Sequence, residues 1–201
     1  MSSHLKNLAS PAFEVPMPAY LLLLAALLSR VVPHSGWYGF TAVGGALLYF
    51  GARRNWREMI APVAAFVAVD YYLTTHVYAY EFHWQEYLIT WAWYAAAIVL
   101  GHILLSARTS VIRVAAAALL GPTSFFLASN YSVWVGAHHP GGMYANSLSG
   151  LITCFAAGLP FYGRDVVSTG LVLAIAFGVE ATVRHLRDNS TLQPSPIRIK
   201  R

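Results

Sequence analysis

Long apolar runs separated by short polar segments are the feature that most constrains this chain. A helix that crosses a bilayer needs about 20 mostly apolar residues, with a range of about 17–25. Runs near this length follow one another along the chain, at 17–32, 37–52, 59–75, 87–105, 111–135, 147–161 and 166–183. Their apolar residues do not alternate with polar ones as those of a barrel strand do. We therefore predict an all-α, polytopic membrane helical bundle.

The scarcity of charge excludes the soluble alternatives. Only 10% of the residues are charged while 57% are hydrophobic, and a soluble domain has about 25% charged residues. Disordered chains are charge-rich and apolar-poor, so they are excluded too. The net charge of +5 comes from basic residues clustered between the apolar runs, which is typical of membrane orientation rather than nucleic-acid binding. The expected environment is the lipid bilayer, and we expect no nucleic-acid partner.

The basic clusters predict which segments face the cytoplasm. Two loops between apolar runs, at 53–57 and 108–113, contain arginines, and the tail beyond residue 184 is basic. The segments 75–86 and 136–145 contain no Lys or Arg. The positive-inside rule places the basic loops and the tail in the cytoplasm and the other two segments outside. Both termini are therefore expected to be cytoplasmic.

The run at 147–161 decides the number of spans. A full crossing there would put the basic tail outside, against the charge rule. The run is short and contains small polar residues and glycines, which are tolerated at membrane depth where they line protein or water. We predict an outer half-helix or a re-entrant segment before the last span, giving six transmembrane helices. The expected organisation is a short cytoplasmic N-terminal segment at 1–16, a membrane domain at 17–184 and a flexible basic cytoplasmic tail at 185–201.

One set of polar and aromatic residues is expected near the outer surface. A carboxylate within a membrane costs a few kcal/mol unless it is paired or wet, so it faces the bundle interior or a cavity. An amide and an indole four residues apart share a helix face and suit a small ring-shaped ligand. The candidate substrate-binding residues are Asp70, Asn130, Trp134, Arg164 and Asp165. Each also has a structural interpretation: an inter-helix polar contact, a belt aromatic, an interface arginine or a helix-dipole carboxylate.

Three further charged residues, Arg30, Glu180 and Arg184, stand in or beside the apolar runs. Arg30 stands at the predicted outer end of the first apolar run, against the charge rule, as Arg164 does before the last one. Glu180 and Arg184 are four residues apart, in the order that favours an ion pair along one helix face.

The sequence has no convincing catalytic or metal-binding pattern. The stretch at 147–150 holds two serines and a glycine, but it lacks the G-x-S-G order of an intramembrane serine protease. No histidine lies in the last span to act as the base that a nucleophile needs. The histidines show no HxH or HExxH spacing, and the single Cys154 excludes an intramolecular disulfide or a CxxC motif. We expect no enzyme activity, no metal and no cofactor.

Three stretches resemble a family of uncharacterised bacterial integral membrane proteins. They are ALLSRVVPHSGWYGFTAVGGALLYFGARR, FFLASNYSVWV and MYANSLSGLITCFAAGLPFYGRDVVSTGL, and with PVAAFVAVDYY they cover most of residues 20–178. That family is similar to the substrate-binding S components of energy-coupling-factor vitamin transporters. The resemblance implies six helices, both termini in the cytoplasm and a pocket that opens outward.

The closest similarity is to the biotin-type S component, whose last helix begins with a P-F-x-x-G-D-x-x-K pattern. The corresponding stretch here is PFYGRDVVS, from Pro160 to Ser168. Asp165 matches the acidic position, whereas Arg164 stands in place of the glycine and Ser168 in place of the lysine. The missing lysine argues against biotin itself.

The resemblance and the site residues together predict a membrane-embedded binding subunit for uptake of a small, vitamin-like organic solute. The sequence has no P-loop, so energy would come from partners, namely transmembrane coupling and ATPase subunits. The expected location is the bacterial inner membrane, crossed several times. The alternative is a non-transport structural or accessory subunit of a larger membrane complex. An outward pocket that admits water would favour solute binding, and a solid bundle with a wide apolar lateral face would favour the alternative.

Overall fold

The computed structural model describes residues 17–31, 41–137, 139 and 141–191, and every regular element within them is helical. The α-helices are α1 Met17–Val31, α2 Val43–Arg53, α3 Ile60–Tyr72, α4 Trp84–Leu105, α5 Val111–Ala137 and α6 Leu148–Thr191. A 3-10 turn, Trp56–Met59, precedes α3 and a π-helical turn, Leu73–Val77, follows it. The prediction of an all-α bundle is therefore confirmed.

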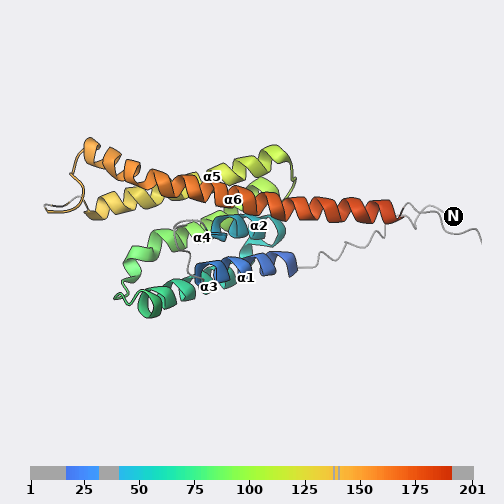
Figure 1. The fold of residues 1–201 in the computed structure, drawn as a ribbon, viewed down its shortest axis with the longest axis horizontal. Helices are drawn as coiled ribbons and strands as arrows, with labels where there is room; N and C mark the ends of the chain where they lie inside the picture. The colour runs from blue at the N-terminus through green and yellow to red at the C-terminus, as the bar shows by residue number, and fades with distance from the viewer. Residues whose placement is uncertain (1–16, 32–40, 138, 140, 192–201) are drawn as a thin grey trace, which may run out of the picture.

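Successive helices run in alternating directions along the bundle (Figure 1). The start of α1, the arginine-containing loops after α2 and α4, and the end of α6 lie at one end, here called the basic end. The connections after α3 and α5, which contain the segments without Lys or Arg, lie at the opposite end. The two kinds of loop are therefore separated as the charge pattern requires. That the basic end faces the cytoplasm stays a prediction.

Four of the helical segments are long and apolar enough to cross a membrane. They are Trp56–Val77, Trp84–Leu105, Val111–Ala137 and Leu148–Asn189. The described part of α1 has 15 residues and α2 has 11; at 1.5 Å per residue α2 is only about 16 Å long. Only the first residues of the second predicted span, 37–40, lie outside the described residues. The structure therefore supports a membrane bundle but not six clear spans.

The segment at 147–161 is not a separate half-helix or re-entrant element. It forms the first part of α6, a single helix of 44 residues that includes Pro160 and continues past residue 184 to Thr191. The small polar residues that suggested a break are compatible with a helix, because their hydroxyls can bond to the preceding turn. Thr153 Oγ1, for example, donates to the Ser149 carbonyl oxygen at 2.8 Å. Packing along α5 then keeps the whole segment helical.

The short helix α2 forms the centre of the core. Every residue from Val43 to Ala52 is buried. Gly51 and Gly101 allow α2 and α4 to meet backbone to backbone: a Cβ added at Gly101 would lie 2.0 Å from the Leu48 carbonyl oxygen, and one at Gly51 would lie 1.8 Å from the Ile98 carbonyl oxygen. We call the half of the bundle around α2 the packed half. It leads from the middle of the bundle to the basic end.

Candidate functional site

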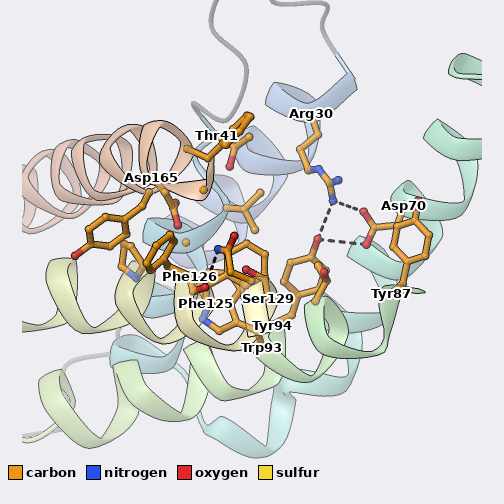
Figure 2. A pocket seen from close by; sticks show the side chains of 18 residues that line it. Arg30, Thr41, Asp70, Tyr87, Trp93, Tyr94, Phe125, Phe126, Ser129 and Asp165 are labelled. Carbon is orange, nitrogen blue, oxygen red and sulfur yellow. Dashed lines mark hydrogen bonds and ion pairs between the residues drawn. The ribbon is translucent and has the colours of Figure 1, made fainter. Parts of the chain in front are cut away.

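A cavity of about 480 Å³ lies where α2 begins, on the side away from the basic end (Figure 2). We call the half of the bundle around it the cavity half. Each of the six α-helices contributes at least one lining residue. The polar and charged side chains among them are Arg30, Thr41, Asp70, Thr90, Ser129, Asn130 and Asp165. The aromatic ones are Tyr87, Trp93, Tyr94, Phe125, Phe126, Phe161 and Tyr162.

Asp70 is the centre of a polar network that joins α1, α3 and α4. Arg30 Nη1 donates to Asp70 Oδ1 at 2.5 Å and to the Tyr94 hydroxyl oxygen at 2.9 Å. Trp91 Nε1 and the Tyr94 hydroxyl donate to Asp70 Oδ2 at 3.0 and 3.2 Å. Asp70 is only 2% exposed. Its charge is therefore balanced by the guanidinium and its two oxygens are both bonded, which is the condition for a carboxylate to lie inside a membrane.

Asp165 is the second carboxylate of the cavity, and it is much less well paired. It is half-buried on α6. The hydrogen bond that it accepts from the Thr169 hydroxyl is long, at 3.4 Å between oxygens. The first turn of α2 lies beside it, because a Cβ added at Gly44 would be 3.7 Å from Asp165 Oδ1. The partial positive charge of that helix N-terminus favours a nearby anion.

The remaining wall is aromatic and carries one amide. The Phe126 and Tyr162 rings, from α5 and α6, lie 4.9 Å apart between centroids, and the Trp93 and Phe125 rings lie 4.7 Å apart. Asn130 Nδ2 donates to the Phe126 carbonyl oxygen at 2.8 Å within α5. Its Oδ1 lies against Gly158, where an added Cβ would approach to 2.4 Å. Gly158 therefore makes room for the amide between α5 and α6.

The structure brings together three of the five predicted site residues. Asp70, Asn130 and Asp165 line the cavity, whereas Trp134 and Arg164 are not among its lining residues. Trp134 is one turn beyond Asn130, where its Nε1 donates to the Ala145 carbonyl oxygen at 3.2 Å. Arg164 is exposed on α6. Adjacent helix residues point in different directions, so Asp165 can face the cavity while Arg164 faces outward.

The site residues predicted from the sequence did not include Arg30 and Tyr94, although both contact Asp70. The signal for Arg30 was present: a guanidinium and a carboxylate in two mostly apolar runs each need a partner, and each can supply it to the other. Tyr94 had no such signal, because a tyrosine in the middle of an apolar run of α4 is compatible with ordinary core packing. Among the described residues, no group of three or more His, Cys, Asp or Glu side chains is placed to hold a metal ion.

The fold and the cavity define the class: a helical membrane protein with a polar and aromatic cavity enclosed between its helices. Residues 12–191 match a family of unknown function (DUF6580), and the chain belongs to that family. No curated protein and no solved structure matches it. The family agrees with the expected uncharacterised one. It carries no link to the S components of vitamin transporters, so that resemblance contributes only to the proposal below.

Proposed function

We propose that this protein is a membrane-embedded binding subunit that takes up a small organic solute into a bacterial cell across the inner membrane. The observation that carries the proposal is the cavity at the start of α2, lined from six helices. Its volume of about 480 Å³ falls within the range of about 300–1,000 Å³ typical of small-molecule sites. A packing defect between helices would not be expected to gather two carboxylates, an arginine and an amide around one space.

The distribution of polar groups also supports solute binding. Small-molecule sites combine a mostly apolar, aromatic lining with a few polar groups that fix orientation. The cavity has this composition, with the Arg30–Asp70 pair, Asn130 and Asp165 set among phenyl, phenol and indole rings. The packed half closes the space toward the basic end, because α2 is buried on all sides there. A solute would then enter from the opposite end, as in the S components that the sequence resembles.

Release into the cell would need an energy source and a change of packing around α2. On this proposal, transmembrane coupling and ATPase subunits supply both, in the manner of energy-coupling-factor transporters. The exposed end of α6, which extends beyond the other helices at the basic end (Figure 1), is in reach of such partners.

A second candidate is an accessory subunit of a larger membrane complex, and one observation favours it. An apolar groove of about 620 Å³ runs along the outside of α3 and α4. Its lining is entirely apolar or aromatic: Met59, Ile60, Val63, Ala64, Val67, Ala68, Tyr71, Phe82, Trp91 and Ala95. Such a lateral face suits a lipid chain or a partner helix. It carries no charged side chain among the described residues, and the indole N–H of Trp91 already donates to Asp70, so the groove offers a solute fewer orienting groups than the cavity does.

Native mass spectrometry of the full-length protein in nanodiscs tests the proposal. The protein would be incubated with a fractionated extract of bacterial small metabolites and washed. We expect a small organic mass to stay bound to the wild type and to be lost from Ser129→Trp, because the indole would fill the cavity. Ala64→Trp, which changes the lateral groove, is the matched control and should keep the mass. Absence of a retained metabolite, or its loss only from the groove variant, would favour the accessory subunit.

A further inference from the structure

The two carboxylates of the cavity differ in how their charges are balanced. Asp70 receives the Arg30 guanidinium at 2.5 Å and two further hydrogen bonds. Asp165 receives one long hydrogen bond from Thr169 among the described residues, and its carboxylate contacts no described cation. In Figure 2 the Arg30–Asp70 pair lies at the right of the cavity and Asp165 at the left. The arginine that balances one acid is therefore committed to it and does not serve the other.

The lining consequently has an excess negative charge. Among the described lining residues, the formally charged side chains are Arg30, Asp70 and Asp165, which leave one negative charge in excess. A single charge at membrane depth costs a few kcal/mol unless a counter-charge or water is present. The N-terminus of α2 beside Asp165 offers about half a charge. That partial charge offsets part of the carboxylate's negative charge but does not neutralise it.

The surroundings of Asp165 suit one kind of counter-charge. Phe161 and Tyr162 precede it on α6, and the Phe126 ring packs on Tyr162 with 4.9 Å between centroids. Aromatic faces attract an organic ammonium group, and the attraction grows when the group is desolvated. A carboxylate that shares a cavity with aromatic rings one helical turn away therefore offers an ammonium ion both a salt bridge and cation–π contacts. A carboxylate ligand would meet repulsion at the same place.

We propose that the cavity selects a cationic solute, a small organic ammonium with an aromatic or apolar body, and that Asp165 binds the cationic group. The body of the solute would lie along the aromatic wall of α5 and α6. Arg30 and Asp70, already paired, would form the far wall and hold α1, α3 and α4 in place. This inference rests on the proposed function, because it assumes that the cavity is a solute site.

Three probes of similar shape and different charge test the inference. They are 2-phenylethylammonium, 2-phenylethanol and 3-phenylpropanoate, titrated into the full-length protein in nanodiscs with tryptophan fluorescence as the readout, since Trp93 lines the cavity. We expect the cation to bind more tightly than the alcohol. Asp165→Asn should lower the affinity for the cation by about 10- to 100-fold, which is the equivalent of one hydrogen bond to a charged group. The alcohol should bind the variant as it binds the wild type.

The controls separate this inference from the proposed function. Asp165→Glu keeps the charge and should keep the preference for the cation, and melting temperatures verify that both variants are folded. Ser129→Trp should abolish binding of every probe. Equal affinity for cation and alcohol, preference for the anion, or an unchanged cation affinity in Asp165→Asn would overturn the inference and leave the solute site standing. Absence of all binding by the wild type would overturn both.

Discussion

The packed half and the cavity half of this bundle each contain an arginine–carboxylate pair, but the two pairs are set in different surroundings. In the packed half, Arg53 on α2 makes a two-pronged contact with Glu180 on α6, with Nε–Oε1 and Nη2–Oε2 distances of 2.8 and 2.6 Å. The Tyr49 hydroxyl also bonds to Glu180, and the Phe177 ring lies 4.8 Å from the guanidinium carbon. In the cavity half, the Arg30–Asp70 pair borders a space of about 480 Å³.

The difference shows how one bundle can combine stability with a binding site. Around α2 the helices meet through glycines, and every acid there has a strong basic partner. Beyond the start of α2 the same helices separate, and one acid, Asp165, is left with a single long hydrogen bond from the described residues. Unsatisfied polar groups reduce stability, and they are retained where function uses them. The packed half is therefore expected to determine the stability of the fold, and the cavity half its ligand.

The strongest test of this comparison removes the close contact of the packed half. In Gly101→Ala the new methyl group would lie 2.0 Å from the Leu48 carbonyl oxygen, so α2 and α4 would have to separate. We expect a loss of about 3 kcal/mol in the free energy of unfolding, the upper part of the usual overpacking range. Unfolding in mixed detergent micelles, followed by tryptophan fluorescence, measures it.

Gly163→Ala is the matched control. Gly163 lies on α6, and a Cβ there meets nothing within 4 Å. The substitution should gain up to about 1 kcal/mol through helix propensity alone. Similar losses in both variants would mean that the close approach of α2 and α4 does not matter.

The next effect tests the ion pair at the cavity wall. Asp70→Asn keeps the shape of the side chain but leaves the Arg30 guanidinium without a carboxylate. We expect a loss of about 1.5–3 kcal/mol in stability, the value of hydrogen bonds to charged groups. The double variant Arg30→Gln, Asp70→Asn should recover part of this loss, because no charge is then left unpaired. A double variant as unstable as the sum of its single variants would contradict the pairing.

A smaller effect compares the two basic partners of Glu180. The side chains of Arg53 and Glu180 are 17% and 22% exposed, whereas that of Arg184, 3.5 Å from Glu180, is 64% exposed. Arg53→Gln should therefore cost about 1.5 kcal/mol, and Arg184→Gln less than about 0.5 kcal/mol, as exposed pairs usually do. Thermal unfolding of both variants under the same conditions decides the order. If Arg184→Gln cost more than Arg53→Gln, the main ion pair of Glu180 would be the one with Arg184 within α6.

The smallest predicted effect is a gain in stability rather than a loss. Asp165→Asn removes a poorly paired charge from the cavity half, so the protein without ligand should become more stable, by about 0.5–1 kcal/mol. Glu180→Gln, which removes a charge with strong partners in the packed half, should instead make the protein less stable. Melting temperatures measured without any added solute compare the two. A loss of stability in Asp165→Asn would show that this acid belongs to the structural framework.

Much of the fold follows from the sequence because it depends on local patterns. The apolar runs predict helices, and the positions of the arginines predict which loops share an end of the bundle, as Figure 1 shows. The prediction of a half-helix or re-entrant segment at 147–161 was wrong, because glycines, serines and Pro160 weaken a helix locally but do not exclude one. Helix α5 packs along α6 and supports the helix through 147–161, and this contact is not visible in local sequence.

The sequence by itself determined that this protein is a helical membrane bundle and which of its loops share an end. It also showed that Asp70, Asn130 and Asp165 are polar groups that need hydrogen-bond or ion-pair partners inside the bundle. Only the tertiary structure decided which partners they have. The local spacing predicts Arg184 beside Glu180, yet Arg53, 127 residues away, makes the shorter contacts. Likewise Arg30 balances Asp70 and leaves Asp165 without a basic partner among the described residues. The physical reason is that charges in a low-dielectric bundle pair through space, and the packing of helices distant in sequence sets those distances.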